Sequence, residues 1–131
     1  MSQDTIRQAL LTYLKSQPDV TALIGSRIYI LSASQTVGDP HVVYSRISAT
    51  RSHAKAGPSG LTESRVQFSI WSKWFREAWA VAEALRHALD GFSGIMNGVN
   101  IRAIRSDGEA DFFESDTKLY QVASDFLIVH E

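Results

Sequence analysis

A change of hydrophobic period past the middle of the chain constrains the fold more than any other feature. In residues 65–73 apolar and polar side chains alternate, with Val66, Phe68 and Ile70 on one side, which is the period of a β-strand with one buried face. In residues 75–90 the apolar positions recur at helical spacing instead. Consecutive strand and helix patterns, each with a single apolar face, predict a sheet that buries one side under helices.

Weaker patterns on either side predict the remaining elements. A helix is expected over residues 4–16, ending before Pro18, because the residue that precedes a proline is pushed out of the α region. Segments rich in β-branched and aromatic residues predict further strands at 27–31, 41–48, 99–105 and 118–129. The expected fold is α+β, a single mostly antiparallel β-sheet packed by two helices, in the order helix, strand, strand, strand, helix, strand, strand. The sequence contains no repeat, so we expect one domain over residues 1–131.

The composition narrows the functions open to such a fold. The 131 residues include 44% hydrophobic side chains, enough for a core, and carry a formal net charge of −1. A protein that wraps nucleic acid by neutralising phosphates needs a surplus of Lys and Arg, and this chain has none. The sequence has no cysteine, which excludes thiolate metal sites and thiol nucleophiles and fits a reducing cytoplasm. No apolar run approaches the roughly 20 residues that span a bilayer, so no membrane partner is expected.

An acidic segment that begins at Asp107 is the strongest candidate for chemistry. Asp107, Glu109 and Asp111 have the alternation that opens a calcium-binding loop. The pattern then fails, because the sixth position holds Phe112 where glycine is needed and the twelfth holds Lys118 in place of glutamate. A looser cation site and a solvated hairpin tip stay open as alternatives for this segment.

Catalytic constellations are otherwise weak in this sequence. The glycine-rich stretch at 57–60 lacks the Gly-Lys-Ser/Thr ending of a phosphate-binding loop, and the histidines are not at metal-ligand spacing. No serine lies in a Gly-x-Ser-x-Gly elbow, although a Ser/His/Asp triad needs only to converge in space. We therefore expect no cofactor, no metal and no enzyme activity. The alternative is a small metal-dependent hydrolase or nuclease that uses residues 107–116.

Several exposed-looking segments are candidates for contacts between subunits or with partners. Residues 49–64 carry no periodicity, which predicts a structureless interaction loop. Its basic alternation is opposite in charge to residues 107–116, so the two segments are a candidate pair between neighbouring subunits. Large aromatic residues cluster between Trp71 and Trp79, where we expect some to be buried and one to lie nearest the surface. The candidate contact residues are Arg51, His53, Lys55, Trp74, Asp111, Phe112, Phe113 and Glu114.

Four stretches carry motifs in a fixed order along the chain. They are Leu-Ile-Gly-Ser-Arg-Ile-Tyr at 23–29, Pro-His-Val-Val-Tyr at 40–44, Arg-Val-Gln-Phe-Ser-Ile-Trp-Ser at 65–72, and Tyr120 with Asp125-Phe126. Their combination resembles the tail-terminator family of long-tailed bacteriophages, also described as tail-completion or tail-to-head joining proteins. The resemblance covers nearly the whole chain. The sequence departs from the family pattern at Ile30-Leu31, where a proline is expected.

The resemblance implies a function without chemistry. Proteins of this family form a ring, commonly a hexamer, that caps the finished tail tube, stops its growth and presents a surface to the head. The implied partners are further copies of the chain, the tail tube protein and a head connector or neck protein, and DNA passes through the ring only transiently. The implied location is the neck region of the virion tail, with the host cytoplasm during assembly. Another neck protein of the same fold and a plain binding module stay open as alternatives.

Overall fold

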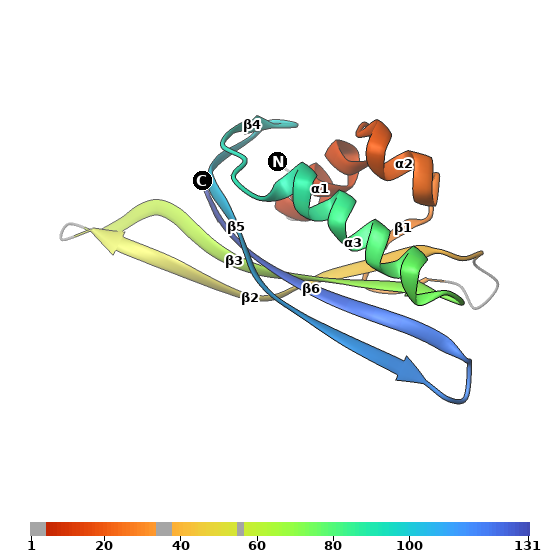
Figure 1. Ribbon diagram of the computed structural model, residues 1–131. Helices are drawn as coiled ribbons and strands as arrows, with labels where there is room; N and C mark the ends of the chain where they lie inside the picture. The colour runs from red at the N-terminus through yellow and green to blue at the C-terminus, as the bar shows by residue number, and fades with distance from the viewer. Residues whose placement is uncertain (1–4, 34–37, 55–56) are drawn as a thin grey trace.

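The chain folds into a six-stranded sheet with its helices on one side (Figure 1). The computed structural model describes residues 5–33, 38–54 and 57–131, and the side chains in those ranges except those of residues 5, 52–54 and 57–59. The elements in chain order are α1 (Thr5–Lys15), α2 (Pro18–Ile24), β1 (Ile28–Ile30), β2 (His41–Ala54), β3 (Gly57–Ser72), α3 (Phe75–Leu89), β4 (Gly94–Met96), β5 (Val99–Glu114) and β6 (Leu119–His130). The α+β class expected from the sequence is confirmed.

The strand order across the sheet is β1-β2-β3-β6-β5-β4. β1 pairs with β2 in parallel and the other neighbours are antiparallel. The four long strands form the middle of the sheet, and the short strands lie outside them. β1 covers β2 only at residues 42–44, and β4 covers β5 only at residues 99–101. The outer sides of β2 and β5 are therefore covered by strands over a small part of their length.

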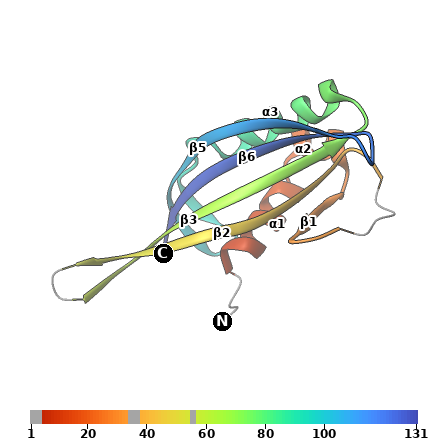
Figure 2. The same cartoon turned by 90° about the horizontal axis from the view of Figure 1, so that it is seen from below.

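One face of the sheet forms the core with the helices, and Figure 2 shows the other face without helices in front of it. The alternation read from the sequence is confirmed, since Val66, Phe68 and Ile70 are fully buried on the helix side of β3. The predicted stripe of α3 is buried against them. Its buried residues are Ala78, Val81, Ala82, Leu85 and Leu89.

An aromatic row crosses the helix side of the three central strands. Tyr44 of β2 stacks on Phe68 of β3 with ring centroids 5.0 Å apart, and Phe68 meets Phe126 of β6 edge-on at 5.6 Å. The Tyr44 hydroxyl donates a hydrogen bond to the backbone carbonyl of Arg7 at 2.6 Å. Burial raises the pKa of Tyr44 well above its ordinary value, so the hydroxyl keeps its proton as a donor. This bond joins α1 to the sheet.

The structure adds a helix and a strand that the sequence pattern did not predict. α1 ends before Pro18 as expected, but Pro18 also begins α2. Proline is tolerated in the first turn of a helix because the N–H groups there have no partner within the helix and the fixed φ of proline is close to the helical value. β4 forms a hairpin with β5, in which Asn97 and Gly98 have positive φ angles of 45° and 88°. Such angles suit the tight two-residue turn between antiparallel strands. No helix in the described part of the chain is long and apolar enough to cross a bilayer.

The structureless loop expected at residues 49–64 is wrong. β2 continues to Ala54 and β3 begins at Gly57, so this segment is a two-stranded hairpin. Beyond Thr62, which pairs with His130 at the end of β6, β3 has only β2 beside it among the described strands. None of the described helices covers this projection (Figure 1), so its residues need no apolar alternation, and the pairing of β2 with β3 defines the strands.

Candidate functional site

The two long hairpins reach opposite ends of the sheet (Figure 1). The β2–β3 hairpin extends past Thr62, whereas the β5–β6 turn at residues 115–118 lies beside Ser72 at the other end of β3. About ten strand residues separate these ends, which corresponds to roughly 30 Å at the rise of a β-strand. Arg51, which lies beside Thr62, and the hairpin tip at the end of the acidic segment therefore lie too far apart to contact each other within one chain.

Two of the three basic candidates, Arg51 and His53, lie on β2 where it pairs with β3 in the projecting hairpin. Arg51 is exposed, and its backbone is paired with that of Thr62. The backbone of His53 pairs with that of Pro58, but the side chain of His53 lies outside the described residues. Lys55 lies wholly outside them. Arg51 is therefore the basic candidate whose position the structure describes.

The acidic segment is mostly strand, and only its end is the expected hairpin tip. Glu109, Asp111 and Phe113 pair with alternate residues of β6 whose side chains lie on the helix side of the sheet. Phe112 and Glu114 therefore lie on the helix-free side. The alternation distributes the carboxylates over two faces, so they do not converge on one point. In the described residues no group of three or more His, Asp or Glu side chains is placed to hold a metal ion.

Asp107 belongs to an ion network on the helix-free face. Its Oδ2 lies 2.7 Å from Nη2 of Arg65, and Nη1 of Arg65 lies 3.4 Å from Oδ2 of Asp125. The amide of Gln67 donates a hydrogen bond of 3.0 Å to Oδ1 of Asp125. The hydrogen bond with Asp107 raises the pKa of Arg65, which stays positively charged. The network connects β3, β5 and β6, and it gives Asp107 a structural role.

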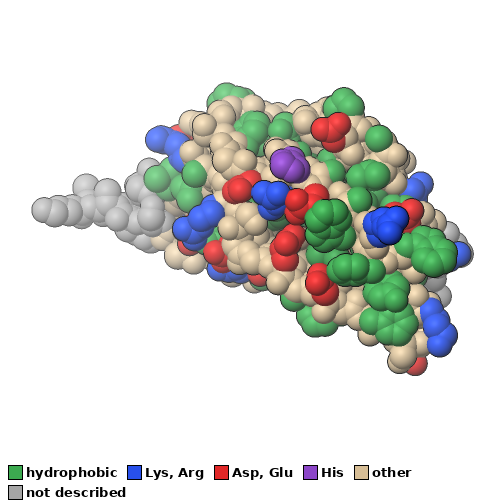
Figure 3. Space-filling view, viewed as in Figure 1, with side chains coloured by type: hydrophobic (Ala, Val, Ile, Leu, Met, Phe, Trp, Pro, Cys, Tyr) green, Lys and Arg blue, Asp and Glu red, His purple; other side chains and the backbone are tan. Residues whose placement is uncertain are grey.

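Exposed aromatic side chains gather around the half-buried Tyr120, where α3 begins and the β5–β6 hairpin ends. The aromatic patch consists of Trp74, Phe75, Trp79, Phe113 and Tyr120. Trp74 is 68% exposed, and Trp79 and Phe113 are each 52% exposed. The ring of Tyr120 contacts both Phe75, at a centroid distance of 5.9 Å, and Phe113, at 4.9 Å. Figure 3 shows hydrophobic side chains gathered at this end of the molecule.

The sequence predicted part of this patch. Trp74 is the most exposed of the aromatic residues at the junction, as expected. The expectation that some of these residues are buried is wrong, because even Trp71 is only half-buried, on the helix-free side. The buried stripe of α3 begins at Ala78, so the first turn of the helix leaves Phe75 outside the core. Trp79 was missed as a candidate, although its place next to Ala78 and off the apolar stripe indicated exposure.

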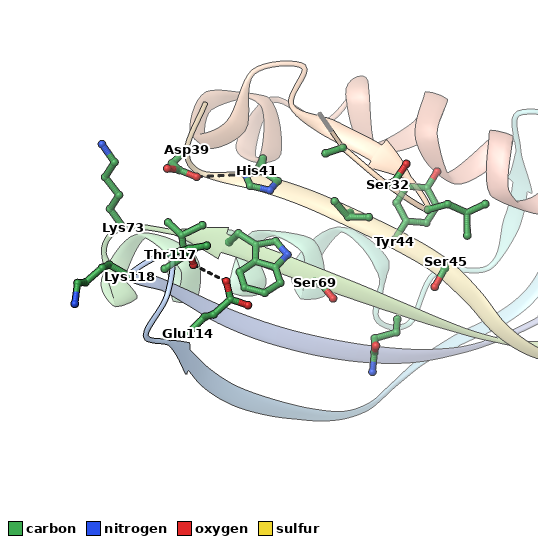
Figure 4. A pocket seen from close by; sticks show the side chains of 16 residues that line it. Ser32, Asp39, His41, Tyr44, Ser45, Ser69, Lys73, Glu114, Thr117 and Lys118 are labelled. Atoms are coloured by element: carbon green, nitrogen blue, oxygen red, sulfur yellow. Dashed lines mark hydrogen bonds and ion pairs between the residues drawn. The ribbon is translucent and has the colours of Figure 1, made fainter. Parts of the chain in front are cut away.

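A groove of about 1000 Å³ lies on the helix-free face beside the β5–β6 turn (Figure 4). Side chains of β2 and β3 form its floor, and the segments after β1 and β5 form its walls. Nδ1 of His41 lies 3.3 Å from Oδ1 of Asp39, and Thr117 donates a hydrogen bond of 2.7 Å to Glu114. Lys73 and Lys118 also line the groove, so its charges are mixed and favour no single class of ligand. Its other lining residues are Leu31, Ser32, Ala33, Val43, Tyr44, Ser45, Gln67, Ser69, Trp71 and Leu119.

Two histidine pairs come nearest to a catalytic arrangement. His41 pairs with Asp39, but no hydrogen bond joins it to a described serine. Nε2 of His130 lies 2.8 Å from Oγ of Ser64, and both residues are buried. Nδ1 of His130 meets the backbone carbonyl of Glu131 at 3.2 Å instead of a carboxylate. Burial lowers the pKa of His130, which favours a neutral ring with a structural role.

Comparison with known proteins gives the family. The sequence model of the family described as "Tail completion protein gp17" matches residues 8–131. No curated protein matches the chain. A similar solved structure is a chain from the virion of a native gene transfer agent particle, with a TM-score of 0.82, 16% sequence identity, and coverage of 96% of this chain and 94% of that chain. At this identity the likeness concerns the fold. Because the family match spans nearly the whole sequence, the chain belongs to the tail completion protein gp17 family and is a structural protein of the phage virion tail.

Proposed function

We propose that copies of this chain form a ring at the head-proximal end of the tail tube. The ring ends growth of the tube and provides the surface on which the head is joined. The aromatic patch is the observation that carries this proposal. Large apolar side chains that gather on one exposed surface are typical of proteins that bury that surface in an assembly.

The arrangement of the two ends supports a closed ring. A ring requires that each subunit presents two different surfaces, one for each neighbour. Arg51 lies at one end of the sheet, and the exposed acids of β5 lie near the other end. Opposite charges at opposite ends favour contact between the unlike ends of two copies. The family resemblance suggests six copies in the ring.

The positions of the polar residues are compatible with a structural role. The carboxylates of β5 are distributed over two faces, and Ser64 and His130 are buried. A net charge of −1 suits a channel through which DNA passes without being held, since binding of phosphates needs a surplus of cations. We therefore propose that the partners are further copies of this chain, the tail tube protein and a head connector.

Assembly of tail tubes in the presence and absence of the protein tests the function. We expect that tubes polymerise without limit alone, and that the added protein stops growth and forms a ring at one end, visible by electron microscopy. The double variant Trp79→Ser with Phe113→Ser should stay folded by circular dichroism but lose this effect. Ile95→Ser is the matched control, because Ile95 is 68% exposed and lies outside the patch.

Other outcomes would point elsewhere. If the wild-type protein leaves tube growth unchanged but binds the isolated head connector, it is a different neck protein of the same fold. If it binds neither partner, the proposed function is wrong. If the double variant ends tube growth as the wild type does, the aromatic patch does not contact the tube or the neighbouring copy.

A further inference from the structure

The outer edge of β5 is open along the acidic segment. Gly91 donates a backbone hydrogen bond of 2.9 Å to the carbonyl of Ile104, and Asp90 accepts one of 3.0 Å from the N–H of Ser106. These bonds come from outside the sheet, so they identify the residues of β5 whose backbone groups point outward. Ile104 and Ser106 pair with every second residue of β6. Beyond the bulge in β5, the residues that continue this alternate series are Glu109, Asp111 and Phe113, so their backbone groups also point outward. No described strand pairs with their outward groups.

The outer edge of β2 is open at the other end of the sheet. Here the N–H of Val42 donates to the carbonyl of Arg27, and the N–H of Leu31 donates to the carbonyl of Tyr44. These bonds show which residues of β2 point toward the edge. These edge-facing residues of β2 pair with every second residue of β3. Past the bulge in β2, the residues that continue this alternate series are Ala49 and Arg51. β1 ends opposite Tyr44, so no described strand covers this part of β2.

The two open edges match in charge and in face. Arg51 pairs with Thr62, which shares the helix side with Ser64 and Val66, so Arg51 lies on that side of the sheet. Glu109 and Asp111 also lie on the helix side. Residues that are directly opposite in paired strands share one face, and a pair of opposite charge there stabilises the pairing. An antiparallel contact therefore places the Arg51 guanidinium beside one of these carboxylates.

The direction and the offset of the edges also suit a ring. β2 and β5 run in opposite directions within the sheet, because β2-β3-β6-β5 is an unbroken antiparallel series. When copies lie side by side in the same orientation, β2 of one copy is consequently antiparallel to β5 of the next. The open parts lie at opposite ends, so each copy is shifted along the strand direction relative to its neighbour. Such a stagger is what closure of a sheet into a barrel requires.

We propose that residues 49–51 of β2 in one copy pair with residues 109–113 of β5 in the next copy, so that the sheets join into one around the ring. This inference rests on the proposed ring. It specifies which parts of the chain form the contact between copies: backbone hydrogen bonds hold the two edges together, and Arg51 with Glu109 or Asp111 selects the unlike edge. The partner is a second copy of this chain.

Cysteine cross-linking tests the register. The sequence has no cysteine, so the introduced thiols are the only ones in this chain. Directly opposed residues on paired strands have Cβ atoms about 4.5–5.5 Å apart, close to disulfide geometry. We expect that Arg51→Cys combined with either Glu109→Cys or Asp111→Cys gives a ladder of covalent oligomers on denaturing gels after oxidation at the tube end. Arg51→Cys with Ile95→Cys is the control and should give no ladder, because Ile95 lies on β4, at the other end of β5 from the acidic residues.

A proline at the edge tests the backbone bonds separately from the charge. Asp111→Pro removes the outward N–H and the carboxylate, whereas Asp111→Ser removes only the carboxylate; proline is tolerated at a strand edge. We expect that Asp111→Pro abolishes the ring and that Asp111→Ser retains it, with both folded by circular dichroism. If neither cysteine pair cross-links and Asp111→Pro caps tubes as Asp111→Ser does, the strand pairing is wrong while the ring stands. If the wild type forms no ring on tubes, both the pairing and the proposed function are wrong.

Discussion

The hydroxyl of Tyr44 lies 2.6 Å from the backbone carbonyl of Arg7 and connects the sheet to the first helix. We expect that Tyr44→Phe lowers the free energy of unfolding by about 1–2 kcal/mol, because it leaves a part-buried carbonyl without this donor. Urea denaturation followed by circular dichroism measures the change. Tyr29→Phe is the control, since no hydrogen bond from the Tyr29 hydroxyl to a described residue is present. Equal stability of the two variants would show that the Tyr44 bond contributes little.

The buried pair of Ser64 and His130 predicts a dependence of stability on pH. The pKa of His130 is lowered first by burial and also by the nearby Arg46, so the unfolded chain binds a proton more readily than the folded one. The contribution of His130 to the free energy of unfolding is therefore fully present above the ordinary histidine pKa of about 6.5 and decreases as the pH falls below it. We expect that the free energy of unfolding decreases between pH 7 and pH 5 by more in the wild type than in His130→Gln. Parallel curves would contradict this assignment.

The two faces of β5 predict that its charges differ in effect. The side chain of Asp111 lies on the helix side of the sheet, as that of Arg51 does. The side chain of Glu114 lies on the helix-free face, where it accepts a hydrogen bond from Thr117. Asp111→Lys should weaken the ring at low salt more than Glu114→Lys does, by about 0.2–1 kcal/mol for each contact, as is usual for an exposed ion pair. The difference should shrink in 1 M salt, where screening extends over only about 3 Å. Light scattering with size exclusion measures it, and Arg51→Asp should partly restore the Asp111→Lys ring.

The same alternation predicts weak binding of divalent cations. Asp107 is held by Arg65, and the remaining carboxylates of the segment lie on two faces. Isothermal titration with Ca²⁺ or Mg²⁺ should therefore give millimolar or weaker binding. Micromolar binding that disappears in Glu109→Gln would restore the cation site as an interpretation of this segment.

The sequence predicted elements wherever burial of one face imposes a period on the side chains. Val66, Phe68 and Ile70 are recognisable because the helices cover one side of β3 and solvent reaches the other. α2 has only seven residues, too few to show a helical period. Pro18 does not distinguish the two cases, because proline is found both just after the end of a helix and in the first turn of one. The extension of β2 to Ala54 carries no hydrophobic period because none of the described helices covers it.

For the candidate contact residues, too, the sequence predicted only part of what the structure shows. Composition identified Trp74, Phe113 and the acidic residues as candidates, and the structure places these side chains on the surface. Composition did not indicate that Asp107 is paired with Arg65, because these residues are far apart in the sequence. The open edges of β2 and β5 were equally hidden, since an edge depends on which strands become neighbours, and no local pattern records that.

The carboxylates on the open edge of β5 also affect copies that are not yet assembled. Two β5 edges that approach each other in antiparallel fashion bring Glu109 and Asp111 of one chain against the same acids of another. Like charges opposite each other destabilise such a pair of strands. The repulsion therefore opposes the pairing of two β5 edges from unassembled copies of the chain. In the proposed ring the same carboxylates face Arg51, so one set of charges favours the unlike edge and disfavours the pairing of two like edges.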